Sequence, residues 1–163
     1  MSNPRLERLA IVCSHPVQYY APLFKLMAKD HAVKVFYNHR QQSQYDPGFN
    51  RDIIWDLPLL EGYEFEFTHT LKDISDYQPT AILIYGWAHC SHLKIIWYFS
   101  HKITILFRGD STLLDQTPFW RQIFKAIVLP KIFQCVHYAL YVGYHNKLYF
   151  QQYGLKSSQL IHT

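Results

Sequence analysis

The sequence has little glycine and lacks the glycine-based motifs that hold phosphate groups. It contains 6 glycines in 163 residues. Neither a Gly-x-Gly-x-x-Gly pattern nor a Walker lysine loop occurs, and a serine-centred nucleophile elbow is also missing. These absences count against nicotinamide oxidoreductases, P-loop NTPases and α/β-hydrolases.

Cysteine pairs, blocks of one charge and long apolar runs are scarce as well. The three cysteines have no close spacing, so they indicate no disulfide framework and favour the reducing cytoplasm, with the inner face of the membrane as an alternative. The net charge of +4 comes without a long Lys/Arg block, so we expect no nucleic-acid partner. No segment has the length of a membrane span, and the N-terminus lacks a signal-peptide core.

Closely spaced groups of metal-binding residues are also scarce. His89-Cys90-Ser91-His92 is the one close group of soft ligands, and no second pair of matching spacing accompanies it. We therefore expect neither a metal site nor a cofactor.

Short apolar runs are what the sequence has in abundance. They are rich in β-branched and aromatic residues and predict strands that are covered on both faces: Leu9 to Cys13, Val33 to Tyr37, Ala81 to Tyr85, Ile103 to Phe107 and Tyr138 to Val142, with weaker candidates at Tyr63 to Phe67 and Gln159 to His162. Helical patterns alternate with these runs. This alternation predicts an α/β fold with a doubly wound, mainly parallel sheet and helices on both faces, formed by a single domain over residues 1–163.

Two connecting stretches have a distinct composition. His39 to Gly62 reads as an irregular loop with a strong turn at Tyr45-Asp46-Pro47-Gly48. Phe119 to Val136 has a helical pattern that Pro130 interrupts, so we expect a kink or two helices. This second stretch is apolar with interspersed Arg and Lys. It either rests on an anionic membrane surface or packs as an ordinary helix with solvated basic side chains.

Polar groups directly follow four of the predicted strands. The four turns begin at Ser14, Gly86, Arg108 and Gly143. Open α/β sheets bind ligands beyond the carboxyl ends of their strands. If these strands are adjacent and parallel, the four turns gather at one edge and form a candidate site.

The residue types in the turns suit a hydroxylated ligand. Asp110 and His15 are candidate catalytic residues, as a general base on a sugar hydroxyl. Arg108 suits a phosphate or carboxylate, and Trp87 suits the apolar face of a sugar ring. The candidate substrate-binding residues are Gln18, Tyr19, Gly86, Trp87, His89, Arg108, Gly109, Ser111, Tyr144, His145 and Asn146.

Each of these assignments has a structural alternative. Asp110 and Ser111 suit a helix cap as well as a ligand contact. His15 suits a hydrogen bond to a neighbouring loop, and His145 suits the start of a helix. Pro16 is predicted to stiffen the turn after the first strand and to lie in the first turn of the following helix.

Five segments in order resemble one known family. "IVCSHPVQYYAPLFKLMA", "YDPGF", "ILIYGWAHCSHLK", "LFRGDSTLLD" and "YALYVGYHNKLYFQQYGL" together resemble the N-terminal domain of bacterial glycosyltransferases of the GT-B fold, the family 4-like group. The resemblance implies the acceptor-binding half of a Rossmann-like enzyme. Such an enzyme transfers a sugar from a nucleotide-sugar donor to a saccharide or lipid-linked acceptor, as in polysaccharide biosynthesis.

The resemblance also implies what a complete enzyme adds. The donor-binding domain of such enzymes follows the N-terminal one, and we expect it to be absent from this chain. The nucleotide-sugar donor would then bind only with a second domain, and a sugar acceptor is the partner of this half. Independently of the resemblance, the stretch Phe119 to Val136 makes a peripheral membrane contact a candidate, and an open apolar-rich face favours self-association.

The chain departs from the family pattern at two turns. Arg108-Gly109-Asp110-Ser111 stands where many relatives carry a His-containing motif, and Ser14-His15-Pro16 replaces a glycine-rich first loop. In retaining relatives the donor phosphate itself serves as the base, so Asp110 and His15 would position substrate rather than deprotonate it. Two other interpretations remain open: a stand-alone Rossmann-like binding module without catalysis, and a truncated product that pairs with itself or another chain.

Overall fold

The computed structural model describes residues 8–40, 43–46, 50–54, 58–68, 70–114 and 118–163. The chain forms two compact units, Met1–Thr80 and Ala81–Thr163, and each is described by itself. The predicted extent of the domain, 1–163, stays a prediction.

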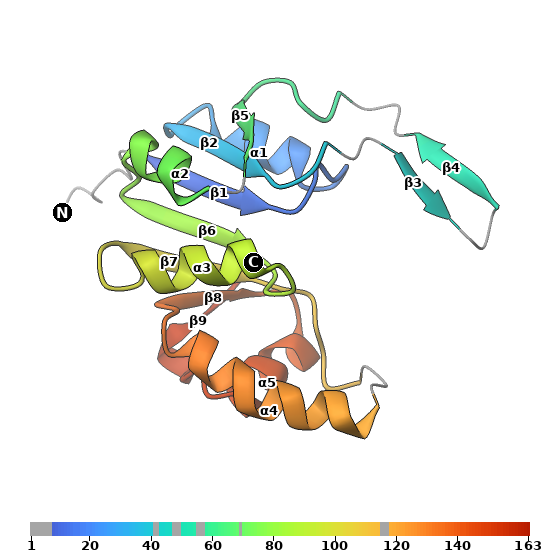
Figure 1. The fold of residues 1–163 in the computed structure, drawn as a ribbon, viewed down its shortest axis with the longest axis vertical. Coiled ribbons are helices and arrows are strands. Elements are labelled where there is room, and N and C mark those ends of the chain that lie inside the picture. Colours follow the sequence, from blue (N-terminus) through green and yellow to red (C-terminus); the bar gives the residue numbers. More distant parts are fainter. Residues whose placement is uncertain (1–7, 41–42, 47–49, 55–57, 69, 115–117) are drawn as a thin grey trace. The chain divides into compact units, whose positions relative to one another are not determined.

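The first unit is a three-stranded parallel sheet with two helices and a hairpin (Figure 1). The strand order is β5-β2-β1. Its elements are β1 (Leu9–Cys13), α1 (Ala21–Met27), β2 (Val33–Tyr37), the antiparallel hairpin β3 (Ser43–Asp46) and β4 (Arg51–Ile54), β5 (Glu64–Phe67) and α2 (Leu71–Tyr77).

Helices cover both faces of this first sheet. Side chains of β2 alternate between the two faces. The Tyr37 hydroxyl lies 2.8 Å from that of Tyr63, whose ring packs edge-on against Phe24 of α1 at 5.7 Å. On the other face the ring of Phe36 meets Tyr77 of α2 at 5.9 Å. Helices on both faces of a parallel sheet confirm that part of the predicted class.

The second unit is a four-stranded parallel sheet with the order β6-β7-β8-β9. Its elements are β6 (Ala81–Tyr85), α3 (Cys90–Phe99), β7 (Thr104–Arg108), α4 (Phe119–Phe133), β8 (Tyr138–Tyr141), α5 (Tyr144–Gln152), the short 3-10 helix η1 (Ser157–Gln159) and β9 (Leu160–His162). Within each unit these strands pair in parallel with their neighbours, as predicted.

Three phenylalanines tie the helices of the second unit to its sheet. The ring of Phe107 in β7 lies 5.5 Å from Phe133 of α4 and 6.0 Å from Phe150 of α5, and the latter two are 5.7 Å apart. All three are buried. Because Phe107 projects from one side of β7, α4 and α5 pack on the same face of this sheet.

The strands match the sequence prediction closely, whereas two connecting stretches do not. The region predicted as an irregular loop contains the hairpin β3–β4, and α2 is an additional helix. Pro130 does not divide its helix, because α4 runs unbroken to Phe133. The prediction of two helices is therefore wrong, whereas the alternative, a kink at Pro130, stays a prediction. Gly154 follows α5 with a φ of 105°, a backbone conformation that favours glycine at the end of a helix.

Candidate functional site

Three of the four predicted turns lie side by side at the carboxyl edge of the second sheet. Strands β6, β7 and β8 are consecutive parallel neighbours, with Tyr85 opposite Arg108 and Arg108 opposite Leu140. The backbone N–H of Gly86 donates to the carbonyl of Arg108 at 2.8 Å, so the first two turns are bonded together. The turns that begin at Gly86, Arg108 and Gly143 therefore share one edge, which we call the carboxyl edge.

The side chain of Asn146 links the turn that follows Arg108 to the turn that begins at Gly143. Its side-chain amide donates to the carbonyls of Gly109 and Ser111, both at 2.8 Å, and its oxygen accepts from the N–H of Val142 at 3.2 Å. The residue is buried. The structure thus gives Asn146, predicted to contact substrate, the task of fixing the turns on which other candidate residues sit.

Arg108 places a positive charge along this edge. It is the last residue of β7 and is half-buried. Its guanidinium lies 5.8 Å from the ring centre of Tyr85, and Nη1 donates to the hydroxyl of Thr163 at 3.3 Å. The side chain is therefore placed where a guanidinium can bind a phosphate or a carboxylate.

Two helices begin at the same edge and add to the positive potential. Helices α3 and α5 follow β6 and β8 after short turns, and neither has an acidic residue in its first turn. The free N–H groups of a helix start favour anions. Together with Arg108, they favour an anionic or strongly hydroxylated ligand over a cationic one.

A side chain is disfavoured at two glycines of the edge, for a different physical reason at each. Gly86 has a φ of 78°, which side chains rarely adopt. A Cβ on Gly109 would lie 3.2 Å from the ring of Phe107, a tight contact with the buried core. The small size of both residues keeps the backbone of this edge accessible.

His92 supports the Gly86 turn, a role that its place in the weak metal-ligand group His89-Cys90-Ser91-His92 did not indicate. Its side chain is fully buried in the first turn of α3, with Nδ1 3.1 Å from the carbonyl of Gly86. Because a carbonyl only accepts, Nδ1 carries the proton. Burial lowers the pKa of His92 to about 4. His89, at the N-cap of α3, lies 5.1 Å away, ring to ring.

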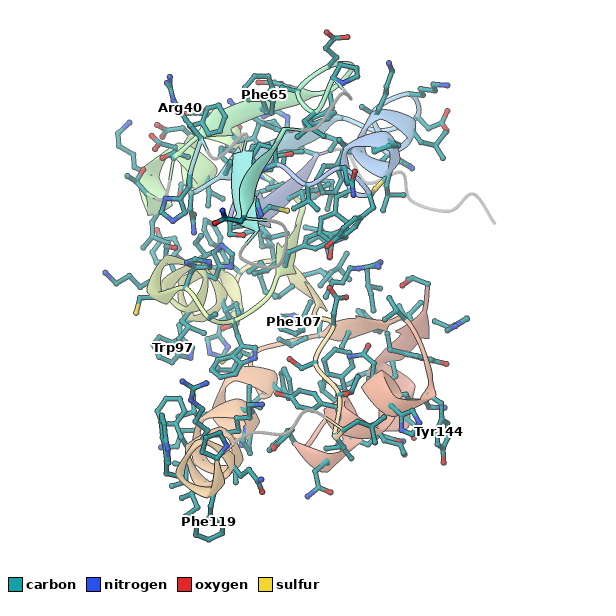
Figure 2. The ribbon with its side chains drawn as sticks, turned by 90° about the vertical axis from the view of Figure 1, so that its right-hand side faces the viewer. Arg40, Phe65, Trp97, Phe107, Phe119 and Tyr144 are labelled. Atoms are coloured by element: carbon teal, nitrogen blue, oxygen red, sulfur yellow. The ribbon has the colours of Figure 1, made fainter. Side chains whose placement is uncertain are left out.

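The remaining candidates of the second unit lie on the surface of this edge. Asp110 and His145 are exposed, and Trp87 and Ser111 are half-buried. Tyr144 is 70% exposed and meets the ring of His145 edge-on at 5.6 Å (Figure 2). These side chains are accessible to a ligand, although their roles as catalytic or binding groups stay predictions.

A hollow of about 310 Å³ lies next to the carboxyl edge. Thr112 and Leu113, which follow the Arg108 turn, form part of its wall, and α4 and α5 form the rest. Lys125 of α4 lines it, with Nζ 5.8 Å from the ring centre of Tyr149.

The turn after β1 belongs to the first unit. His15 Nδ1 lies 2.9 Å from the hydroxyl of Ser14, whose carbonyl accepts from the N–H of His39 at 2.9 Å. Gln18 is half-buried and Tyr19 is exposed. Whether these residues meet the carboxyl edge of the second unit stays a prediction.

The expected place of Pro16 is wrong. Helix α1 begins only at Ala21, and the proline in its first turn is Pro22. Pro16 is instead buried in the turn that precedes the helix. A further turn over residues 18–20 separates Pro16 from the start of the helix at Ala21.

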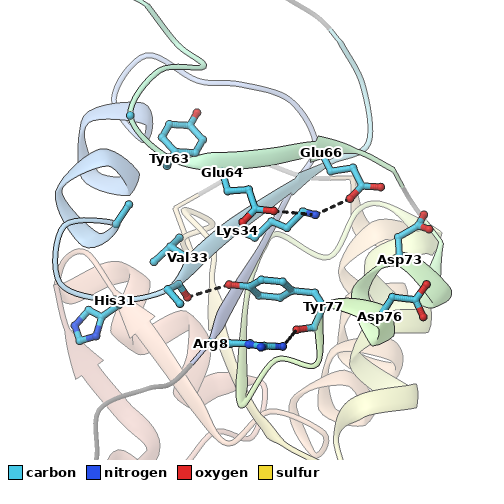
Figure 3. Close-up of a pocket in the computed structure, with 13 residues that line it drawn as sticks. Arg8, His31, Val33, Lys34, Tyr63, Glu64, Glu66, Asp73, Asp76 and Tyr77 are labelled. Carbon is cyan, nitrogen blue, oxygen red and sulfur yellow. Dashed lines mark hydrogen bonds and ion pairs between the residues drawn. The ribbon is translucent and has the colours of Figure 1, made fainter.

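The first unit has a larger pocket, of about 790 Å³, at the amino ends of its strands (Figure 3). Lys34 lies at its centre, with Nζ 3.2 Å from Glu64 and 2.9 Å from Glu66. The hydrogen bond that Lys34 donates to Glu66 contributes most to raising the pKa of Lys34. The Tyr77 hydroxyl donates to the carbonyl of Ala32 at 3.0 Å.

The main charged groups of this pocket contact other groups of its own lining. Arg8 Nη1 donates to the carbonyl of Tyr77 at 3.0 Å, and Lys34 binds both glutamates (Figure 3). These contacts join the sheet to α2 and pair the charges. We therefore assign the pocket a structural role and place the candidate site at the carboxyl edge of the second unit.

Comparison with known proteins yields a likeness of fold. No family model and no curated protein matches the sequence. A solved structure does match: the UDP-N-acetylglucosamine 2-epimerase from Rickettsia bellii, with a TM-score of 0.63 and 11% sequence identity. The alignment covers 97% of this chain and 44% of the epimerase, so the chain spans less than half of that enzyme. The chain has a Rossmann-like α/β fold.

No described helix is long and apolar enough to cross a membrane. The cysteines at positions 13, 90 and 135 form no disulfide. Cys13 is buried in β1, and burial raises the pKa of its thiol. A protonated, buried thiol is a poor nucleophile, so Cys13 serves packing.

Proposed function

We propose that this chain is the acceptor-binding half of an enzyme that transfers a sugar from a nucleotide-sugar donor to a saccharide or lipid-linked acceptor. The observation that carries the proposal is the carboxyl edge of the second unit, where Arg108, Gly86 and the starts of α3 and α5 lie together. The fold likeness to an enzyme whose name includes a nucleotide sugar is consistent with this. The GT-B assignment and the family 4-like assignment remain parts of the proposal.

The side chains at the edge have distinct tasks in this proposal. Trp87 stacks on a sugar ring, and Arg108 binds an anionic group of the acceptor. The hollow beside Thr112 receives the next sugar or the linker of the acceptor. Asp110 orients the hydroxyl that attacks, or takes its proton if no donor phosphate does so.

Titration of the chain with acceptor-type saccharide phosphates tests the binding half of the proposal. Amide chemical shifts should move in the turns after β6, β7 and β8, with weak affinity. Arg108→Gln should weaken binding at least about tenfold, because a charged hydrogen bond to the ligand is lost.

Lys102→Gln is the matched control for the titration. Lys102 precedes β7 and so lies at the opposite end of the strand that Arg108 terminates. Its loss removes the same charge and should leave the affinity within about twofold. Shifts confined to the pocket around Lys34, or equal effects of the two substitutions, would contradict the proposal.

A transfer assay separates the enzyme from a binding module. The chain alone should bind acceptor without turnover, and turnover should appear when a donor-binding domain is supplied. The favoured alternative, a Rossmann-like module without catalysis, predicts the same saccharide binding and no turnover under either condition.

A further inference from the structure

Helix α4 exposes an apolar face that the described residues of the second unit do not cover. Phe119, Trp120, Ile123, Phe124 and Ile127 are between 47% and 76% exposed. Their spacing places them on one side of the helix. We call these five residues the apolar face of α4. Single exposed apolar residues are ordinary, but five together on one helix mark an interaction surface.

The helix is held to its sheet by a different stripe. Leu129, Ile132 and Phe133 are buried, and Phe133 packs on Phe107 of β7. The apolar face therefore takes no part in packing α4 on its own sheet. In α3, which contacts α4, Trp97 and Tyr98 are also about half exposed. Figure 2 shows Trp97 and Phe119 on the same side of the second unit.

Basic side chains accompany the exposed rings. The guanidinium of Arg121 lies 5.0 Å from the ring centre of Trp120, and Lys102 Nζ lies 3.2 Å from that of Tyr98. Lys131 lies one turn beyond Ile127 and is exposed. Long basic side chains next to aromatic rings are the usual composition of helices at a membrane interface.

The positive charge of the second unit indicates what kind of surface the apolar face of α4 binds. The sequence from residue 118 to residue 163 contains no Asp or Glu. The second unit has eight Lys and Arg against two Asp and Glu, a net charge of +6, whereas the first unit has eight against ten, or −2. An anionic surface complements this unit, whereas a second copy of the same face would bring like charges together.

We propose that the apolar face of α4 docks on an anionic lipid bilayer. The helix lies in the plane of the interface, with its rings among the acyl chains and Arg121 and Lys131 at the headgroups. No described helix can span the bilayer, so the contact is peripheral. This inference goes beyond the proposed function and does not depend on it.

Vesicle binding of the full 163-residue chain tests the proposal. The probes are vesicles of phosphatidylcholine alone and of phosphatidylcholine with phosphatidylglycerol in a ratio of about three to one. The chain should co-sediment with the anionic vesicles and hardly with the neutral ones, and binding should fall as salt rises. The fluorescence of Trp120 should shift to the blue when the vesicles bind.

Two double variants separate the apolar from the electrostatic part. Phe124→Ser with Ile127→Ser should weaken binding to the anionic vesicles more than about tenfold, because two large apolar side chains leave the acyl region. Arg121→Gln with Lys131→Gln should weaken it about fivefold for each charge removed. All four side chains are at the surface, so circular dichroism should report an unchanged fold.

Leu23→Ser with Leu26→Ser in α1 is the matched control. These two leucines are 38% and 58% exposed, and they belong to the first unit. Their loss should leave vesicle binding unchanged. Binding that neither α4 variant reduces, or no binding to the anionic vesicles, would overturn the proposal. Self-association of the chain that the Phe124 and Ile127 variant abolishes, without vesicle binding, would assign the face to a second copy and also overturn it.

Discussion

The two units use charge and burial in opposite ways. The first unit carries a net charge of −2 and pairs its charges at the surface, as Lys34 does with Glu64 and Glu66. The second unit carries +6 and fixes its carboxyl edge with buried neutral groups, His92 and Asn146. A site built on buried supports keeps its surface groups available for a ligand, whereas paired surface charges satisfy each other.

The largest expected difference between the two units is the loss of folding stability at acidic pH. The pKa of His92 is about 4 in the folded chain and near its usual 6.5 in the unfolded one. Between these values the unfolded chain binds more protons. The second unit should therefore lose up to about 3 kcal/mol as the pH falls from about 6.5 to about 4.

The first unit should respond to acid only at lower pH. Hydrogen bonds from the hydroxyls of Thr68 and Thr70 lower the pKa of Asp73. This contribution is present above the ordinary pKa of an aspartate and is lost as the pH falls below it.

Hydrogen exchange of β7 and β2 amides measures the two units separately. His92→Asn keeps a donor for the carbonyl of Gly86 and removes the titrating group, so it should flatten the response of β7 above pH 4 or so. An equal decline in β2 and β7 over this range, or a decline in β7 that the variant retains, would break the comparison.

Removal of the buried amide should have the next largest effect. Asn146→Ala leaves the carbonyls of Gly109 and Ser111 and the N–H of Val142 without this partner. The cost should be about 2 kcal/mol of unfolding free energy, measured by urea denaturation.

Tryptophan fluorescence suits that measurement, because Trp87, Trp97 and Trp120 all belong to the second unit. Trp55 belongs to the first unit, so the measurement uses chains that carry Trp55→Phe. His145→Ala, at the exposed neighbouring position, should change the free energy by less than about 0.5 kcal/mol. If the two alanine variants were equally stable, Asn146 would not be the support described here.

Removal of the Lys34 charge should have the smallest effect. Lys34→Met keeps the stem that packs near Phe36 and Tyr77 and removes both ion pairs. The Glu64 and Glu66 side chains are 62% and 40% exposed, so solvent and salt screen both pairs, and we expect a loss of about 0.5 kcal/mol in low salt and less in high salt. A loss as large as that of Asn146→Ala would show that the first unit depends on its charge pairs as the second depends on its buried amide.

Five strands, β1, β2, β6, β7 and β8, were predictable because each is a short, largely apolar run between turn signals. Parallel pairing then fixes which residues come at carboxyl ends, and so Gly86, Arg108 and Gly143 were found from the sequence. The sequence pattern did not predict the hairpin β3–β4 or helix α2. These elements are short and have no long apolar pattern, so their local signals are weak.

The roles of His92 and Asn146 were not predictable. The partners of Asn146 lie 35 and 37 positions earlier in the chain, and no local pattern encodes such a distance. As a polar residue after a strand, Asn146 has the same sequence signal as the exposed His145. Only burial distinguishes the support from the surface group.

The sequence by itself determined the α/β class, the strand positions and the polar turns that follow them, because period and composition are local properties of the chain. The tertiary structure decided which polar residues are buried supports, which lie at the surface, and that α4 keeps five apolar side chains exposed while a second stripe packs on the sheet. These outcomes depend on what each side chain meets across the fold, and neighbours distant in the chain set that.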